Sequence, residues 1–337
     1  MRVRERERLT NLALAALLAL AVVTGLTANA AGTSWGRTFV VLHGAVGLAL
    51  LVLGPRKSRI ADRGLRRRRR HVGWHASLVL AGLVIVTVVS GLVATTGVTD
   101  RVGPLSLMQV HIGSAVLAVP LAVSHYRGHH VRPRTTDLSR RALLRTGAVA
   151  AAAGVSWLSW EGVMRVAGWP GKGRRFTGSH ERGSGDPAAM PVTQWLDDTV
   201  QQLDASTWRL TVAGAVYTLA DLRALPLETF DATLDCTSQW YARQSWRGVR
   251  LDRLIDPGDA RSIEVRSVTG YPVRLPVRDL DRVWLALEEG GEPLSPGHGF
   301  PVRLVAPGRR GFWWVKWVQQ VERSPQPWWV QSPFPLT

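Results

Sequence analysis

Long runs of apolar residues in the first half of the chain constrain its fold more than any other feature of the sequence. Four of them, residues 9–31, 38–53, 75–97 and 105–124, are long enough, or nearly so, to cross the ~30 Å hydrocarbon core of a bilayer. A fifth and weaker run, residues 142–160, is interrupted by Arg145. The sequence therefore predicts an N-terminal, all-α bundle of transmembrane helices.

The charge of the chain indicates how these spans are oriented. The formal net charge is +17, and Arg residues supply almost all of the positive charge. Basic residues cluster at residues 1–8, 56–70 and 127–141, whereas residues 32–37 and 98–104 are nearly uncharged. A large positive net charge can indicate nucleic-acid binding. Here, however, the basic residues lie in loops between apolar runs, as the positive-inside rule for membrane proteins describes. We therefore expect a multi-pass protein of the cytoplasmic membrane, without a nucleic-acid partner, whose residues 170–337 lie outside the cytoplasm.

Four histidines lie within or at the ends of the predicted spans, where an ionisable side chain is costly and is a functional candidate. His43 and His111 lie near the outer ends of their spans, and His75 and His125 lie at the inner face. His111 and His125 are 14 residues apart, so they lie about 21 Å apart along one helix, within about 40° of the same face. Pairing His43 with His111 and His75 with His125 would form two bis-histidine haem b sites, a geometry similar to that of bundle cytochromes b. The alternative for His75 and His125 is a solvated position beside a basic loop.

The second half of the chain contains the only cysteine, Cys236. A lone cysteine cannot form an internal disulfide, so it is a buried inert thiol, a nucleophile or a metal ligand. Apolar and polar residues alternate over residues 230–234, which predicts a half-buried strand that delivers Cys236 at its end. Aromatic, small and apolar residues then follow the cysteine at defined spacings: Trp240, Trp246, Gly248, Leu251 and Leu254.

A second block of residues supports a metal-binding role for this cysteine. It consists of residues 298–307, which begin His-Gly-Phe-Pro-Val-Arg, followed by Gly311 and Lys316. Together the two blocks, over residues 176–325, resemble the molybdopterin domain of the sulfite oxidase superfamily, and are most similar to its methionine-sulfoxide reductase branch. The resemblance implies Mo-molybdopterin as cofactor and Cys236 as a molybdenum ligand, which suits a soft thiolate.

The resemblance also assigns contacts to the cofactor. His298 would contact the pterin, and Arg303 and Lys316 would hold the phosphate, to which a guanidinium donates in a bidentate manner. The alternative for Arg303 and Lys316 is an exposed strand charge. The expected cofactor-binding residues are Thr193, which aligns only loosely, Cys236, His298, Arg303, Lys316, and Trp314 and Val315 through their backbone amides.

One departure from the sulfite oxidase pattern bears on the substrate. Sulfite oxidases carry an Arg five positions after the cysteine, whereas this chain has Tyr241 there, with Arg243 nearby. We therefore expect reduction of a small-molecule or protein S-oxide, or of an N-oxide, with electrons from the membrane quinone pool or another membrane redox partner. Tyr241 and Arg243 are candidate catalytic residues beside Cys236. The alternatives are a sulfite-oxidase-like enzyme that passes electrons to the membrane chain, and the same catalytic domain on a haem-free anchor.

The expected organisation is multi-domain. The second half is expected to be an α+β domain dominated by sheet, with short strands near residues 208–212, 262–268, 282–287, 302–306 and 315–322. Ser139-Arg140-Arg141 begins a twin-arginine-like segment that would remain as the fifth span. The expected parts are a four-helix transmembrane domain at residues 1–138, the fifth span at 139–168, a linker at 169–190, the molybdopterin domain at 191–325 and a tail at 326–337.

Overall fold

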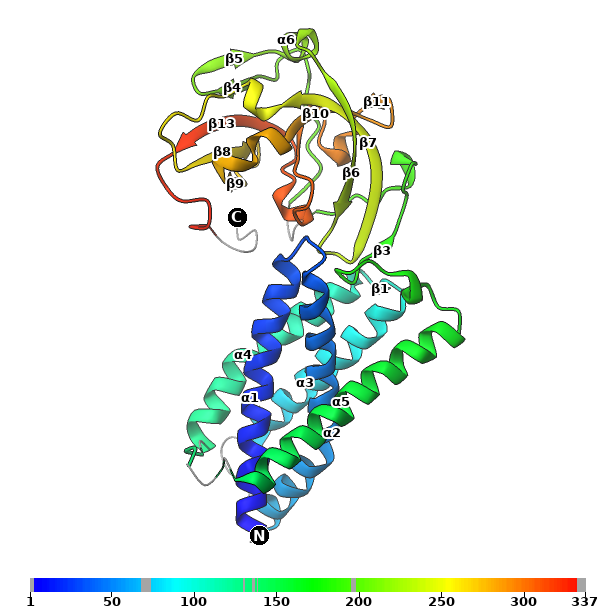
Figure 1. Ribbon diagram of the computed structural model, residues 1–337, viewed down its shortest axis with the longest axis vertical. Coiled ribbons are helices and arrows are strands. Elements are labelled where there is room, and N and C mark those ends of the chain that lie inside the picture. Colours follow the sequence, from blue (N-terminus) through cyan, green and yellow to red (C-terminus); the bar gives the residue numbers. More distant parts are fainter. Residues whose placement is uncertain are drawn as a thin grey trace. The chain divides into compact units, whose positions relative to one another are not determined.

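The computed structural model describes residues 3–67, 74–129, 131–134, 137, 139–194 and 198–331 (Figure 1). The chain divides into two compact units, a helical unit (residues 1–29 and 34–180) and a sheet unit (residues 30–33 and 181–337). Parts of both predicted basic loops, and residues 332–337 of the predicted tail, lie outside the described residues. N-terminal helices are followed by a sheet-rich domain, which confirms the predicted multi-domain layout.

Five helices in the described part of the helical unit are long and apolar enough to cross a membrane, by length and composition. The last of them is continuous through Arg145, so this charge does not break the helix. Its N-terminus is capped by the hydroxyl of Ser139, which accepts a hydrogen bond from the Ala142 N–H at 3.3 Å. The helices are α1 (Val3–Ala30), α2 (Gly36–Arg67), α3 (Trp74–Thr96), α4 (Leu107–His129) and α5 (Arg140–Val166).

Small residues allow these helices to pack closely. Helix α3 packs along α4, joined to it by a hairpin of β1 (Arg101–Val102) and β2 (Leu105–Ser106), and α2 packs along α5. At Gly44 a Cβ atom would lie only 2.0 Å from the ring of Trp157, so glycine is required for this α2–α5 contact. The indole N–H of Trp160 donates to the hydroxyl of Thr95 at 2.8 Å and ties α5 to α3.

The sheet unit contains two sheets among its described residues. One has six strands, in the order β11–β10–β7–β3, with β12 also paired to β10 and β6 also paired to β7; the other has five, in the order β5–β4–β13–β8–β9. The strands of this unit are β3 (His180–Glu181), β4 (Leu210–Val212), β5 (Ala215–Tyr217), β6 (Glu228–Asp235), β7 (Trp240–Arg250), β8 (Ser262–Ser267), β9 (Pro272–Leu275), β10 (Trp284–Glu289), β11 (Glu292–Pro293), β12 (Arg303–Val305) and β13 (Val318–Ser324).

Strand β7 is the central element for the site. Its side chains alternate between buried and exposed, as expected of a strand with one face on the core, and the buried Trp246 packs edge-on against Trp314, with 5.7 Å between ring centroids. At Gly248 a Cβ atom would lie 2.2 Å from the Leu285 carbonyl oxygen of β10, so only glycine permits this approach. The Trp and Gly spacings after Cys236 therefore follow one strand that was not predicted as such.

The predicted strand positions are confirmed, and one short helix has a well-defined N-terminal cap. Strands occur at or within a few residues of each of the predicted positions. Helix α6 (Leu219–Ala224) begins with the capping box of Thr218 and Asp221, in which each side chain accepts from the other residue's backbone N–H.

Candidate active site

Cys236 lies in the turn of the β6–β7 hairpin, immediately after β6. The turn is closed by the Cys236 N–H, which donates to the Trp240 carbonyl oxygen at 2.8 Å. Its geometry is further supported by a buried ion pair between Arg310 and Asp235, and by a hydrogen bond of 3.2 Å from Arg310 to the Cys236 carbonyl oxygen. The Ser238 N–H lies 3.5 Å from the Cys236 sulfur and donates to it. This turn holds the thiol in one position, as a metal ligand requires.

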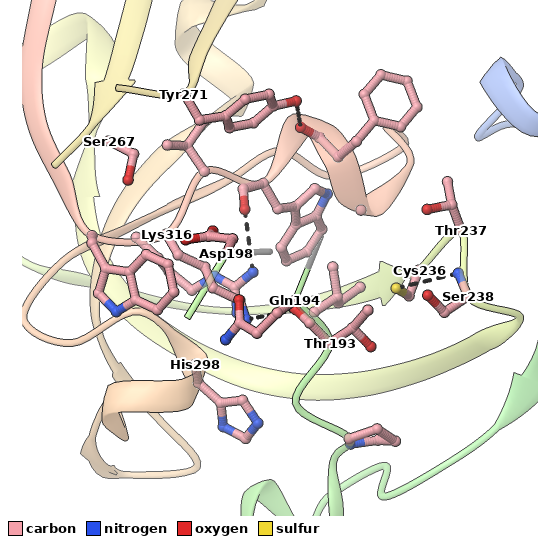
Figure 2. Close-up of a pocket in the computed structure, with 18 of the residues that line it drawn as sticks. Thr193, Gln194, Asp198, Cys236, Thr237, Ser238, Ser267, Tyr271, His298 and Lys316 are labelled. Carbon is pink, nitrogen blue, oxygen red and sulfur yellow. Dashed lines mark hydrogen bonds between the residues drawn. The ribbon is translucent and has the colours of Figure 1, made fainter. Parts of the chain in front are cut away.

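A cavity of about 390 Å³ opens beside this thiol. It joins residues that are far apart in the sequence, and Figure 2 shows Cys236 on one side of the lining and His298 and Lys316 on the other. The sequence-predicted residues that line it are Thr193, Cys236, His298, Arg303, Trp314, Val315 and Lys316.

Arg303 is fully buried in the wall of this cavity, with 1% of its surface exposed. Its guanidinium lies beside the contacting rings of Trp246 and Trp314, at 5.2 and 5.7 Å from their centroids. Burial lowers the pKa of Arg303 to about 10, against the opposing influence of Glu289 and Cys236. Its Nε and Nη1 atoms have no hydrogen-bond partner among the described residues. A buried cation with two unsatisfied donors in a cavity wall is suited to an anionic ligand such as a phosphate.

Lys316 is the second cation of the wall. Its ammonium group donates to the Thr193 carbonyl oxygen at 3.0 Å, and the Thr193 hydroxyl accepts from the indole N–H of Trp240 at 2.9 Å. Thr193, whose match to the cofactor-binding pattern of the family was loose, therefore connects Lys316 to β7, the strand that follows Cys236. Burial, together with repulsion from Arg303, lowers the pKa of Lys316 to about 7.

The remaining expected cofactor contacts are arranged as follows. His298 is buried beside the cavity, and its Nε2 lies 3.2 Å from the Met190 carbonyl oxygen. The Trp314 N–H donates to the Gly311 carbonyl oxygen at 3.0 Å within a turn, and the Val315 carbonyl oxygen accepts from the Leu304 N–H at 2.7 Å. The Trp314 amide is thus used inside the protein in this structure, and its contact with a cofactor stays a prediction.

Tyr241 and Arg243 lie on β7 but are not part of the described lining of the cavity. Arg243 is exposed on the sheet surface, where it pairs with Asp231 at 3.0 Å. Because β7 alternates, residues 241 and 243 share the face opposite to Trp240 and Trp246. Their catalytic role stays a prediction that the arrangement of these side chains does not support.

Other lining residues carried no signal in the sequence. They have no motif and come from loops and turns that only the fold brings together. Tyr271, whose hydroxyl donates to the Phe312 carbonyl oxygen at 2.7 Å, is one such residue, and burial raises its pKa. Gln194 and Asp198 are two more. Thr237 and Ser238, which directly follow Cys236 in the chain, and Phe312, which follows Gly311, also line the cavity.

Among the described histidines of the helical unit, His43 and His111 form a close pair. The His43 and His111 rings lie 5.8 Å apart, centroid to centroid, at 88° to each other. His125 Nδ1 lies 3.1 Å from the Ser77 hydroxyl of α3, while His75 is exposed and lies against Trp74. The rings of the predicted outer pair, His43 and His111, are therefore in contact. His75 lies at the N-terminus of α3 and His125 near the C-terminus of α4.

Replacing Lys316 with Met should stabilise the cofactor-free protein and weaken its hold on the cofactor. Because the pKa of Lys316 is lowered from 10.5 to about 7, the unfolded chain binds a proton that the folded protein does not over this interval. Wild-type stability should therefore fall as the pH falls through it, by up to about 1.4 kcal/mol per pH unit. Melting curves at several pH values, with released pterin measured by fluorescence, test both effects.

The exposed Lys172 offers a matched control, because Lys172→Met removes the same charge at a solvated position. An identical pH dependence of melting in wild type and Lys316→Met would contradict the assignment.

Comparisons with known proteins agree with this site. Residues 197–330 match the family described as oxidoreductase molybdopterin binding domain. The chain is 27% identical to the uncharacterized oxidoreductase YuiH of Bacillus subtilis (38% of this chain, 73% of YuiH) and 29% identical to mitochondrial sulfite oxidase of Homo sapiens (38% and 31%). It is also 29% identical to a protein of Azospira oryzae named "Putative protein-methionine-sulfoxide reductase subunit YedZ1" (36% and 51%).

The chain thus spans less than a third of the length of human sulfite oxidase and about half of the Azospira protein. The matched region contains Cys236 and both buried cations of the cavity. Arg303, Lys316 and the thiol form a donor set that suits an anionic cofactor with a thiophilic metal. Residues 197–330 thus match an oxidoreductase molybdopterin-binding domain and are similar to sulfite oxidase, and the protein is a molybdopterin-dependent oxidoreductase.

Proposed function

We propose that the protein reduces an S-oxide or N-oxide at its molybdopterin site, outside the cytoplasm, with electrons from membrane quinol. The observation that carries the substrate class is the charge of the described cavity lining. Its cations are Arg303 and Lys316, with His298 as a third ionisable base, all assigned to the cofactor, whereas Thr237, Ser238 and Phe312 near Cys236 are uncharged. An anion such as sulfite would find no cation of its own there, while a neutral or zwitterionic oxide needs none.

In this proposal bound molybdopterin supplies a metal that exchanges an oxygen atom and two electrons with the substrate. Cys236 would hold that metal, Arg303 and Lys316 would bind the phosphate, and His298 would contact the pterin. The hydroxyls of Thr237 and Ser238 offer hydrogen bonds to the substrate oxygen, and the ring of Phe312 excludes water. The overall reduction consumes two electrons and two protons and releases water.

The geometry of His43 and His111 supports a haem between them. The Nδ1 atom of His111 lies 2.7 Å from the Thr87 carbonyl oxygen, and that of His43 lies 3.0 Å from the Ala21 carbonyl oxygen. Each Nδ1 is therefore the protonated donor, which leaves Nε2 with a free lone pair for a metal, the usual arrangement of ligating histidines. Two imidazoles on either side of one iron have centroids roughly 6 Å apart, given Fe–N bonds of about 2 Å.

Glycines adjoin both rings of this pair. A Cβ atom at Gly25 would lie 3.0 Å from the His43 ring, and one at Gly91 would lie 2.9 Å from the His111 ring. Each histidine is thus held against the backbone of a neighbouring helix, which supports a defined ring orientation. The proposal of a second haem at His75 and His125 is supported only by their similar depth in the helical unit.

The proposed topology places the N-terminus inside and the sheet unit outside, after five spans. It rests on the Arg-rich composition of alternate loops. A reporter fused after Thr337 that is active only outside the cytoplasm should be active. Activity of a cytoplasm-only reporter at the same position would contradict the topology.

The substrate class is tested with the purified full chain, after its molybdenum and iron contents are measured. Reduction of methionine sulfoxide and of trimethylamine N-oxide with a reduced dye should exceed sulfite oxidation with an oxidised dye by at least ~100-fold, the effect of about 2.7 kcal/mol of transition-state binding. The opposite ranking would favour the sulfite-oxidase-like alternative. Molybdenum without iron would favour a haem-free anchor.

A further inference from the structure

Tyr271 lines the cavity, yet the proposed reaction gives it no role. It lies in the turn between β8 and β9, directly before β9. Backbone hydrogen bonds fix this turn, from the Ser267 N–H to the Tyr271 carbonyl oxygen at 2.9 Å and from the Gly270 N–H to the Ser267 carbonyl oxygen at 3.0 Å. A third bond, from the Val268 N–H to the Trp317 carbonyl oxygen at 2.9 Å, ties the turn to the residue before β13. The Tyr271 side chain therefore extends from a firmly held backbone.

The phenol of Tyr271 binds a second element of the cavity wall. Its hydroxyl donates to the Phe312 carbonyl oxygen at 2.7 Å, a bond drawn as a dashed line in Figure 2. Burial raises the pKa of Tyr271, so the phenol remains a hydrogen-bond donor at neutral pH. Phe312 belongs to the short 3₁₀ turn Gly311–Trp313, and a Cβ atom at Gly311 would lie 3.0 Å from the Cys236 Cα. The bond thus joins the β8–β9 turn to the turn that packs against Cys236.

Other contacts of the 311–313 turn are local. The Trp313 N–H donates to the Arg310 carbonyl oxygen at 2.9 Å, which sets the shape of the turn. The ion pair of Arg310 with Asp235 anchors its N-terminal end. Phe312 lies beyond that anchor and lines the cavity. The bond from Tyr271 therefore ties Phe312 itself to another element of the wall.

We propose that Tyr271 is a positioning residue that holds the ring of Phe312 beside Cys236 and thereby limits the width of the approach to the metal site. The consequence for the substrate, which rests on the proposed function, is selection for a slender oxide. A methyl group on the sulfur or nitrogen is admitted, and an aromatic ring is hindered. In this role Tyr271 acts through the backbone of Phe312 and takes no part in the transfer of oxygen.

The width of the approach can be measured without cofactor or turnover, because Cys236 is the only cysteine of the chain. In the cofactor-free full chain, its thiolate is alkylated by N-methylmaleimide or by the bulkier N-pyrenylmaleimide. Tyr271→Phe should raise the rate with the bulky reagent about fivefold, the effect of one hydrogen bond of about 1 kcal/mol, and leave the rate with the small reagent within about twofold. The ratio of the two rates is independent of the pKa of the thiol, since both reagents react with the same thiolate.

Phe312→Ala tests whether Tyr271 acts through Phe312. This variant removes the ring that narrows the approach, so the rate with the bulky reagent should rise by at least as much as in Tyr271→Phe. Adding Tyr271→Phe to it should then change the rate by less than about twofold. Independent, multiplicative increases in the double variant would contradict the proposed role.

Tyr217→Phe is the matched control. It removes a phenol hydroxyl from β5, which is the other edge strand of the sheet that ends in β9, and Tyr217 is not part of the described lining of the cavity. Both alkylation rates should equal those of wild type. An equal increase in Tyr217→Phe and Tyr271→Phe would indicate a general loosening of the domain and would overturn the proposal.

The cofactor-loaded enzyme tests the consequence for the substrate. With a reduced dye, wild type should have a kcat/KM for dimethyl sulfoxide at least ~10-fold above that for methyl phenyl sulfoxide. Tyr271→Phe should reduce this preference about fivefold, through methyl phenyl sulfoxide alone. If wild type reduces neither sulfoxide, the proposed function fails, while the maleimide rates still decide the role of Tyr271. An unchanged ratio of maleimide rates in Tyr271→Phe would overturn that role, and an unchanged sulfoxide preference would overturn the selection for slender oxides.

Discussion

Replacing Cys236 with Ser should abolish substrate reduction and remove molybdenum from its normal coordination, while the protein remains folded and in the membrane. The substitution changes only sulfur to oxygen, and the hairpin turn is held by backbone hydrogen bonds and by the Arg310–Asp235 ion pair. Substitution of a residue that only supports a metal ligand already lowers metal affinity or activity by about 10–100-fold. Loss of the ligand itself should therefore lower turnover by more, on the order of 1,000-fold. Dye-driven reduction and the Mo(V) electron paramagnetic resonance spectrum measure this.

Two further measurements separate the loss of a ligand from the loss of the fold. The melting temperature of Cys236→Ser should remain within a few degrees of wild type, since a partly exposed thiol is exchanged for a hydroxyl of similar size. The haem spectrum should be unchanged because the substitution lies in the sheet unit. Full activity in this variant would refute the role of Cys236 as metal ligand.

If the proposed outer haem is bound between His43 and His111, His111→Ala should remove it and uncouple quinol oxidation from substrate reduction. The ring of His111 faces that of His43 at 5.8 Å, and its Nδ1 is held by the Thr87 carbonyl oxygen. Quinol-driven reduction should fall by at least ~100-fold, since the other imidazole alone cannot hold the iron in a bis-histidine site. Dye-driven reduction should remain within about twofold of wild type, because the molybdopterin residues lie in a separate unit.

His125→Ala provides the comparison for this result. Its ring lies beside Ser77, at the other end of α4, so its loss should remove the inner haem signal and leave the outer one. Reduced-minus-oxidised absorption spectra and iron content per protein distinguish the two variants. Unchanged haem content in both would mean that the helical unit is an anchor and that electrons reach the site by another route.

The amino-acid sequence by itself determined those features that depend on neighbours along the chain. Runs of about 20 apolar residues have a single solution in a bilayer, because every backbone polar group must be satisfied within the segment. The predicted spans therefore agree with α1 to α5. The capping box at Thr218 and Asp221 is equally local, and so is the strand that ends before Cys236.

The tertiary structure decided which distant residues meet. Strand β7 was not predicted from the sequence because it mixes Trp, Arg and Gln residues. Its alternation of buried and exposed side chains can be recognised only once one face of the strand packs on a core. Nothing in the chain indicates that the Thr193 carbonyl accepts from Lys316, or that Glu289 lies beside His298, since these pairs come from separate loops and strands. Propensity and periodicity report local backbone preferences, whereas a buried charge is stabilised by whichever partner the fold brings within a few ångströms.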